Sequence, residues 1–243
     1  MEVADRVYRL GAELVNWFII EDGGKVTLVD AGNPNQIDQL EPALATLDLS
    51  IADVEAVLLT HAHGDHLGSS ATIKERARAD VHVHDSDAAL ARGEGHREYE
   101  RHYVRDLRHT YAWKSLLFFL RGGALKAPPV AELKTFAEGE QLDVPGRPRV
   151  LHTPGHTDGS SCLAIEDRDV VFTGDSLVTL NIVTGAQGPR VMPGSFNKNS
   201  AQALASLERL VSQLANVILP GHGEPWQGSV AAAVSQARRI GPS

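Results

Sequence analysis

Residues 60–66 read Thr60-His61-Ala62-His63-Gly64-Asp65-His66, so four side chains that can bind a metal fall within a few positions. The apolar run at 54–59 that precedes them predicts a buried strand. On a helix His61 and Asp65 would share one face while His63 pointed elsewhere, whereas a loop that leaves a strand lets all four side chains converge. Buried polar groups without partners cost several kcal/mol, and imidazole with carboxylate suits Zn, Fe or Mn. The stretch therefore predicts a metal site at the end of a buried strand.

The same pattern, an apolar run followed by a polar side chain, recurs along the chain. The runs at 26–29, 149–153, 170–173 and 217–220 lead into Asp30, His156, Asp175 and His222. This repetition predicts two similar halves that face one another, with polar side chains gathered at one edge of two sheets. Apolar residues at helical spacing predict helices at 37–47, 68–78 and 201–214.

A segment from about residue 88 to residue 140 breaks this rhythm and is helical in composition. Its arginines have the spacing of one helix face; they are Arg97, Arg101, Arg105 and Arg108. Two interpretations stay open: a solvated charged face above an apolar one, or a lid over the metal site whose aromatic side chains hold an apolar part of a substrate. The second makes substrate-binding candidates of Tyr103, Tyr111 and Trp113, joined by Phe196 just before the helix at 201–214.

Length and composition favour one soluble globular domain that spans residues 1–243. The formal net charge of -8 argues against electrostatic binding of nucleic acid. The one cysteine, Cys162, excludes an internal disulfide and fits a reducing compartment. No signal peptide is visible, and no apolar run is long enough to span a bilayer. We therefore expect a cytoplasmic protein with a small-molecule substrate and with neither nucleic-acid nor membrane partners, and we leave a homodimer open.

Five motifs occur together, in an order that resembles the metallo-β-lactamase superfamily. They are Asp30-Ala31-Gly32, His61-Ala62-His63-Gly64-Asp65-His66, Thr153-Pro154-Gly155-His156-Thr157, Gly174-Asp175 and Gly221-His222-Gly223. The resemblance covers nearly the whole chain. It implies an α/β (α+β) fold, an αββα sandwich of two mixed β-sheets flanked by helices, with a helical insert at about 88–140 between the halves.

The resemblance also implies two divalent metal ions, with Zn as the default and Fe or Mn as alternatives. The first ion would take His61, His63 and His156. The second would take Asp65, His66 and His222, and Asp175 would bridge the two ions. Asp30 matches a residue that orients the ligand loop.

The activity implied is hydrolysis, in which a hydroxide shared by the two ions attacks an ester, thioester, lactone or amide carbonyl of a small molecule. Asp65 and Asp175 are the candidate catalytic carboxylates, and Asp65 could relay a proton. The presence of both His66 and Asp175 resembles the glyoxalase-II-like and lactonase-like branches, because true β-lactamases lack the bridging Asp.

Other functions stay open on the same scaffold. One is a mononuclear iron sulfur dioxygenase, against which the full second set of ligands argues, and another is a true β-lactamase. A nucleic-acid-processing enzyme is disfavoured by the net charge of -8, and a non-catalytic binding module by the seven intact ligand positions.

Overall fold

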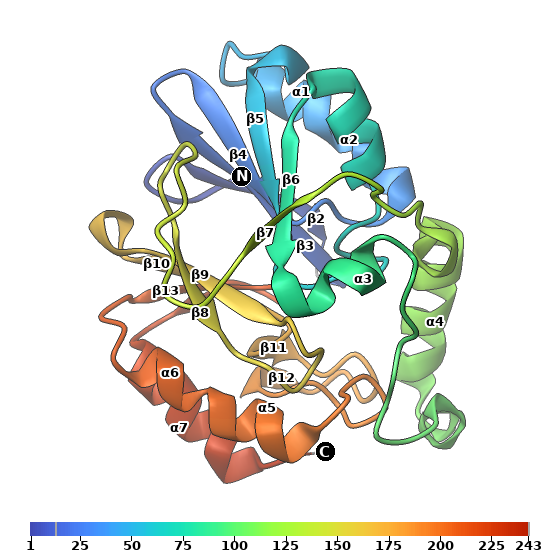
Figure 1. The fold of residues 1–243 in the computed structure, drawn as a ribbon. Helices are drawn as coiled ribbons and strands as arrows, with labels where there is room; N and C mark the ends of the chain where they lie inside the picture. The colour runs from blue at the N-terminus through green and yellow to red at the C-terminus, as the bar shows by residue number, and fades with distance from the viewer. Residues whose placement is uncertain (13, 243) are drawn as a thin grey trace.

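Two β-sheets lie face to face in the computed structural model, which describes residues 1–12 and 14–242 (Figure 1). The first sheet has seven strands in sequence order. They are β1 (Glu2–Ala4), β2 (Val7–Ala12), β3 (Val15–Asp22), β4 (Lys25–Val29), β5 (Val54–Leu58), β6 (Asp80–His84) and β7 (Lys134–Phe136). Strands β1 to β4 pair antiparallel, and β4 to β7 pair parallel.

The second sheet has five strands in the order β14-β13-β10-β9-β8. They are β8 (Arg149–His152), β9 (Ser161–Ile165), β10 (Val170–Gly174), β13 (Val217–Pro220) and β14 (Trp226–Gln227). A separate two-stranded ribbon, β11 (Val178–Leu180) with β12 (Gln187–Arg190), follows β10. Both large sheets are mixed, as predicted.

The period of two along each strand builds three apolar layers. On β3, Phe18 and Ile20 point between the sheets, where the ring of Phe18 meets Phe172 edge-on at 5.3 Å. Trp17 and Ile19 point to the opposite face, into a second core beneath the helices. Strand alternation thus buries both faces of β3, which explains why it reads as a continuous apolar run.

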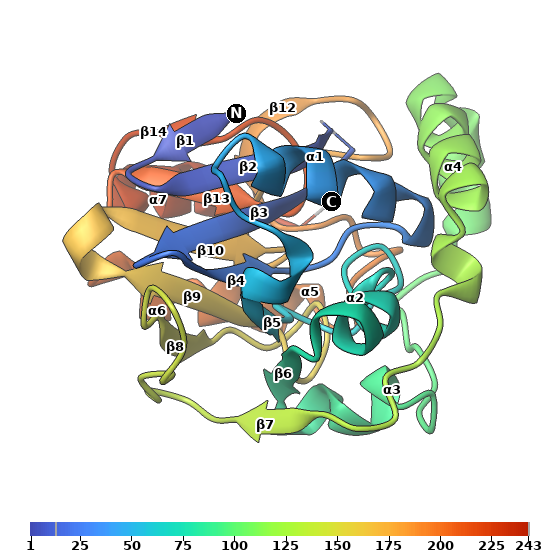
Figure 2. The same ribbon diagram turned by 90° about the horizontal axis from the view of Figure 1, so that it is seen from above.

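Helices cover the outer face of each sheet (Figure 2). Over the first sheet lie α1 (Leu40–Ala45), α2 (Ser70–Ala77) and α3 (Ala88–Ala91). Over the second lie α5 (Ser200–Ser206), α6 (Glu208–Val211) and α7 (Val230–Ile240). The order helix, sheet, sheet, helix is the αββα sandwich that the sequence predicted.

Two of the predicted helices are interrupted in the structure. The first prediction, 37–47, becomes a 3₁₀ helix η1 (Pro34–Gln39) followed by α1. Pro42 in the first turn of α1 has no N–H to donate backwards, so the α-helical ladder does not extend further toward the N-terminus. The second, 201–214, is divided at Leu207 into α5 and α6. Other 3₁₀ turns are η2 (Ile51–Asp53), η3 (Asp85–Asp87) and η6 (Glu166–Arg168).

The 88–140 segment differs most from its prediction. It contains α3, η4 (Tyr103–Arg108), α4 (Thr110–Gly122) and η5 (Ala124–Lys126), but residues 92–102 form no helix. A common helix face for the four arginines is therefore wrong, because Arg97 and Arg101 lie on irregular chain. Its end is also part of the sandwich, since β7 pairs with β6. Helix α4 stands at the side of the sandwich, away from both sheets (Figure 2).

One edge of the sandwich collects the carboxyl ends of five strands. Strands β4 and β5 are parallel, and so are β10 and β13. Strands β8 and β10 are both antiparallel to β9 and therefore end on the same side. No helix in the described part of the chain is both apolar enough and long enough to cross a lipid bilayer.

Candidate metal centre

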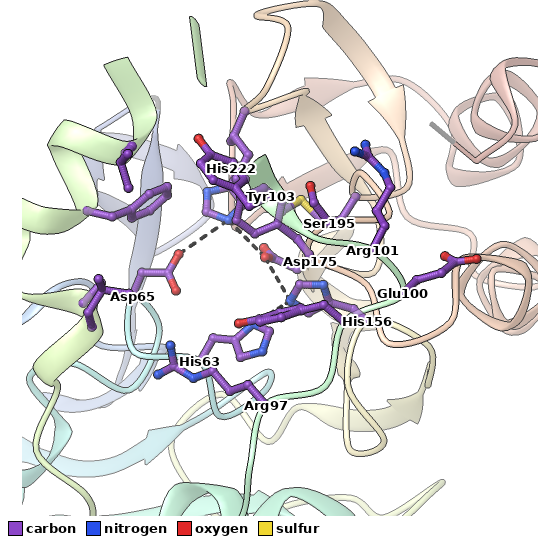
Figure 3. A pocket seen from close by; sticks show the side chains of 18 of the residues that line it. His63, Asp65, Arg97, Glu100, Arg101, Tyr103, His156, Asp175, Ser195 and His222 are labelled. Atoms are coloured by element: carbon purple, nitrogen blue, oxygen red, sulfur yellow. Dashed lines mark hydrogen bonds and ion pairs between the residues drawn. The ribbon is translucent and has the colours of Figure 1, made fainter. Parts of the chain in front are cut away.

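All seven predicted ligands meet at this edge, from loops that leave four strands. Figure 3 shows five of them, His63, Asp65, His156, Asp175 and His222. The loop after β5 carries His61, His63, Asp65 and His66, and the ends of β8, β10 and β13 lead into His156, Asp175 and His222. Six of these residues are buried, and the side chain of Asp65 is 16% exposed. Strand ends hold these loops in place, so the cluster is preorganised by the sheets.

Three histidines form the first group. The Nε2 atom of His156 lies 3.1 Å from Nε2 of His61 and 2.9 Å from Nδ1 of His63. Hydrophobic packing does not explain why three imidazole nitrogens face one another at this separation. Their common focus is suited to one cation held by three neutral imidazoles.

The second group adds carboxylates. Asp65 Oδ2 lies 3.6 Å from Nε2 of both His66 and His222. Asp175 stands between the groups: its Oδ2 is 3.3 Å from His156 Nε2 and 3.0 Å from His222 Nε2. A carboxylate in this position can serve both groups at once.

Close packing requires glycine beside the ligands. A Cβ at Gly221 would lie 2.4 Å from Asp175 Oδ1, and a Cβ at Gly64 would lie 1.9 Å from the carbonyl oxygen of Ala124. These glycines let the backbone approach the carboxylate and let the start of η5, just after α4, pack on the ligand loop.

Asp30, at the end of β4, holds the first ligand loop. Its Oδ1 accepts a hydrogen bond from the backbone N–H of Thr60 at 2.8 Å, and its Oδ2 is 2.8 Å from His66 Nδ1. A proton on His66 Nδ1 leaves Nε2 with a free lone pair directed at the cluster. This is the carboxylate–histidine arrangement found behind metal-binding imidazoles.

Two further histidines are oriented from behind in the same way. His156 Nδ1 lies 3.2 Å from Oδ1 of Asn197, whose Nδ2 donates to the Met192 carbonyl at 2.7 Å and so fixes the amide orientation. His222 Nδ1 contacts the carbonyl oxygen of Leu14. Each places Nε2 toward the cluster.

Burial and neighbouring charges shift the pKa values of the five ligand histidines in different directions. Burial lowers the pKa of His61 and His63 well below the usual value and lowers that of His156. Burial also opposes protonation of His66 and His222, but Asp175 outweighs it and raises both pKa values. Burial raises the pKa of Asp175, yet the cationic form of His222 and its neighbours holds it well below its usual range.

The donor set fits divalent cations. His66 Nε2 and Asp175 Oδ1 are buried and have no hydrogen-bond partner among the described residues, although both point into the cluster. Buried polar atoms are normally satisfied, and such exceptions need an explanation. A cation bound by these atoms supplies it, and their imidazole and carboxylate chemistry suits Zn, Fe or Mn.

Asp87, after β6, joins two ligand loops and was missed in the sequence. Its Oδ2 accepts hydrogen bonds from Ala62 N–H at 3.0 Å and Thr157 Oγ1–H at 2.8 Å, and its Oδ1 accepts from Gly159 N–H at 2.7 Å. Burial raises the pKa of this carboxyl group, which these hydrogen bonds oppose. It follows a strand end as Asp30 and Asp175 do, and that was the available signal.

A cavity of ≈ 480 Å³ opens above the cluster, within the usual size of small-molecule sites. Of the predicted substrate residues, Tyr103 and Phe196 line it, and their rings meet at 5.3 Å. Tyr111 and Trp113 do not line it. Tyr111 packs beside Gly185, and Trp113 is 55% exposed, with its indole N–H donating to the Leu107 carbonyl.

Other residues of the cavity wall were not among the predicted substrate-binding residues. Tyr99 and Phe119 lie against His63 and His222, with ring centroids 5.9 Å and 6.1 Å apart. Arg97 also lines the cavity, close to His63 (Figure 3). The tertiary path of the insert places these side chains at the site. That path cannot be predicted from the spacing of residues in the sequence.

Comparison with known proteins agrees with this geometry. The uncharacterized protein Rv2581c of Mycobacterium tuberculosis is 28% identical over 197 residues, which cover 77% of this chain and 79% of that protein. The probable metallo-hydrolase YflN of Bacillus subtilis is 24% identical over 236 residues, which cover 93% of this chain and 87% of that protein.

Two solved structures share both fold and sequence. The metallo-beta-lactamase family protein TTHA1429 from Thermus thermophilus has a TM-score of 0.66 and 29% identity, over 97% of this chain and 79% of that one. TTHA1623 in a di-iron-bound form has a TM-score of 0.63 and 28% identity, over 95% of this chain and 96% of that one. The family description of the Metallo-beta-lactamase superfamily matches residues 10–222. The chain therefore belongs to the metallo-β-lactamase superfamily.

Proposed function

We propose that this chain is a dinuclear metal-dependent hydrolase that cleaves an ester, thioester, lactone or amide of a small molecule. The observation that carries the proposal is the position of Asp175, whose carboxylate lies within 3.3 Å of a histidine from each ligand group. The di-iron form of TTHA1623 and the name of YflN, a probable metallo-hydrolase, support it.

The residues would divide the work as follows. One ion would be held by His61, His63 and His156. The other would be held by Asp65, His66 and His222. Asp175 would contact both ions. Two such ions, Zn by default and Fe or Mn as alternatives, would supply Lewis acidity and a water with its pKa lowered to about 7.

Asp65 is the candidate for proton transfer. It is the ligand with the greatest side-chain exposure, and it lines the cavity where a substrate would lie. Its Oδ2 could accept a proton during attack and return it to the leaving group. Apolar side chains on the cavity wall, including Phe119 and Phe196, would exclude bulk water from that transfer.

The presence of both His66 and Asp175 favours the lactonase-like and glyoxalase-II-like branches over true β-lactamases. Solved β-lactamases such as Rm3, at 21% identity and a TM-score of 0.70, support the shared fold alone.

A substrate panel on the metal-loaded protein tests the activity. The panel contains esters, thioesters, lactones and a chromogenic β-lactam. We expect hydrolysis of at least one of the first three classes, its loss on chelation and its return with added Zn. Hydrolysis of the β-lactam alone would contradict the branch assignment, and O₂ uptake by a one-iron protein without hydrolysis would favour a sulfur dioxygenase.

A further inference from the structure

Two chemically different walls flank the metal centre. On one side, Arg97 lies near His63, and one of its terminal nitrogens is 3.0 Å from where a Cβ on Gly64 would stand. On the other side, Phe119 packs beside His222 with ring centroids 6.1 Å apart. His63 and His222 belong to different ligand groups, so the cavity runs across the centre from a cationic wall to an apolar one.

The apolar wall has a definite composition. Helix α4 supplies Leu116 and Phe119, and the chain around the β11–β12 ribbon supplies Ile182 and Met192, with Phe196 following. Tyr103 supports this wall: its hydroxyl donates to the Ala112 carbonyl at 2.7 Å, so its polar end is already used. An apolar chain of a substrate fits this side.

The cationic wall is available for a ligand because its neighbouring acids are engaged elsewhere. Glu98 pairs with Lys198 at 2.8 Å, Glu100 accepts from the Ser200 N–H at 3.1 Å, and Asp106 pairs with Arg101 at 2.5 Å. Within residues 1–12 and 14–242, no carboxylate forms an ion pair with Arg97.

The positive charge of Arg97 acts on two ionisable side chains of the cavity wall, His63 and Tyr99. Burial raises the pKa of the Tyr99 hydroxyl, and the positive charge of Arg97 opposes that rise. Asp65 also faces Tyr99 from the ligand loop. An exposed guanidinium at a cavity mouth is suited to an oxyanion, which its planar fork binds through two hydrogen bonds.

We propose that the substrate has an oxyanion, carboxylate or phosphate, on one side of the scissile carbonyl and an apolar chain on the other, with Arg97 as the residue that selects the oxyanion. This inference rests on the proposed hydrolase activity. Water adds to the carbonyl carbon, and the bond from that carbon to the leaving sulfur or oxygen breaks. The leaving group takes up one proton of the water, and the new carboxyl group releases the other to solvent. The acyl product is therefore a carboxylate in every case, and the substrate's oxyanion and apolar chain are separated on different products.

Matched thioesters test the charge. S-hexanoyl mercaptoacetate is compared with its neutral amide, S-hexanoyl mercaptoacetamide, and the S-hexyl thioester of succinate with its methyl ester. A phosphonate in place of the mercaptoacetate carboxylate separates the two oxyanions. We expect the wild-type, Zn-loaded protein to prefer the charged member of at least one pair by about tenfold in kcat/KM, as expected for one charge-assisted hydrogen bond.

Variants assign that preference to one residue. Arg97→Gln should abolish it by raising KM for the charged member, and Arg97→Lys should keep part of it. Arg105→Gln, an exposed arginine outside the cavity, is the matched control and should behave as wild type. Equal rates within every pair for the wild-type protein, or equal losses for charged and neutral members in Arg97→Gln, would overturn the inference and leave the hydrolase proposal standing.

A binding measurement keeps the two proposals separate. The thioether (hexylthio)acetate has no scissile carbonyl and cannot be hydrolysed, and its binding can be compared with that of its amide by calorimetry. Tighter binding of the acid that is lost in Arg97→Gln supports the inference even if no member of the substrate panel is cleaved, in which case the hydrolase proposal fails alone. Equal binding of acid and amide overturns the inference.

Discussion

The metal centre and the cavity wall supplied by the 88–140 segment lie side by side but are built differently. The ligands stand at the ends of paired strands, and six of the seven are buried. Three of them, His66, His156 and His222, are held from behind by a second hydrogen bond. The wall comes from irregular chain and α4, and its members include side chains as exposed as Leu125, at 63%. We therefore propose that the sheets position the metal ligands and that the insert selects the substrate.

Removal of the carboxylate that lies between both ligand groups should have the strongest consequence. Asp175→Ala should lose at least one metal and more than about 10²-fold in kcat/KM, because even residues behind the ligands contribute 10–100-fold. Metal analysis and kinetics check this, with the exposed Asp167→Ala as control. Near wild-type turnover with full metal content would refute the dinuclear site.

The next test concerns a residue that holds ligand loops without being a ligand. Asp87→Ala leaves the buried N–H groups of Ala62 and Gly159 without their acceptor. We expect metal affinity to fall by about 10–100-fold and the free energy of unfolding to fall by about 2 kcal/mol. Competitive chelator titration and denaturant unfolding measure these changes.

Asp85→Ala is the matched control for this variant, since Asp85 is exposed two positions earlier on the same turn. Asp87→Asn, which keeps an acceptor oxygen, should recover part of the affinity. If Asp87→Ala binds metal as tightly as Asp85→Ala does, the loops do not depend on this carboxylate.

A change in the cavity wall supplied by the insert should alter substrate binding and leave metal binding unchanged. Phe119→Ala enlarges the apolar side of the cavity, so KM for an apolar substrate should rise about tenfold with metal content unchanged. Trp113→Ala, on the same helix but outside the cavity, should leave KM unchanged. Loss of metal in Phe119→Ala would show that the centre and the wall are not independent.

A smaller effect concerns protons. Burial opposes charge on His66 and His222, but their carboxylate neighbours raise both pKa values, which favours the protonated forms in the metal-free protein. Metal binding must displace them, and we expect about one or two protons released per chain. Calorimetry in buffers of different ionisation enthalpy counts them, and zero release would contradict this account. Release should diminish as pH rises through the raised pKa values.

The sequence contained most of the centre because ligand chemistry is local. His61 to His66 form one short loop, and each remaining ligand follows a recognisable apolar run. The αββα order followed from the family resemblance and is confirmed. Helix α7 was overlooked, although Ser229, which caps it by accepting from Ala232 N–H, precedes an apolar face at Val230, Ala233 and Val234.

The cavity wall was harder to predict because it depends on tertiary packing. The arginine spacing fitted a helix, but residues 92–102 are held by contacts with distant chain, such as the Glu100 N–H to the Asn197 carbonyl at 2.7 Å. Tyr111 and Trp113 have the right chemistry for a substrate wall, but on α4 they face away from the cavity, whereas Leu116 and Phe119 face it. The rotation of α4 about its own axis is set by its packing against the β11–β12 ribbon.

The most direct test of the central claim starts from wild-type protein whose metal has been removed with a chelator. This protein is titrated with Zn and, separately, with Fe. Elemental analysis then gives the metal content, and hydrolysis of the best substrate in the panel gives the activity. The account predicts saturation at two ions per chain, with activity that appears as the second ion binds. Saturation at one ion, with full activity at that point, would contradict it.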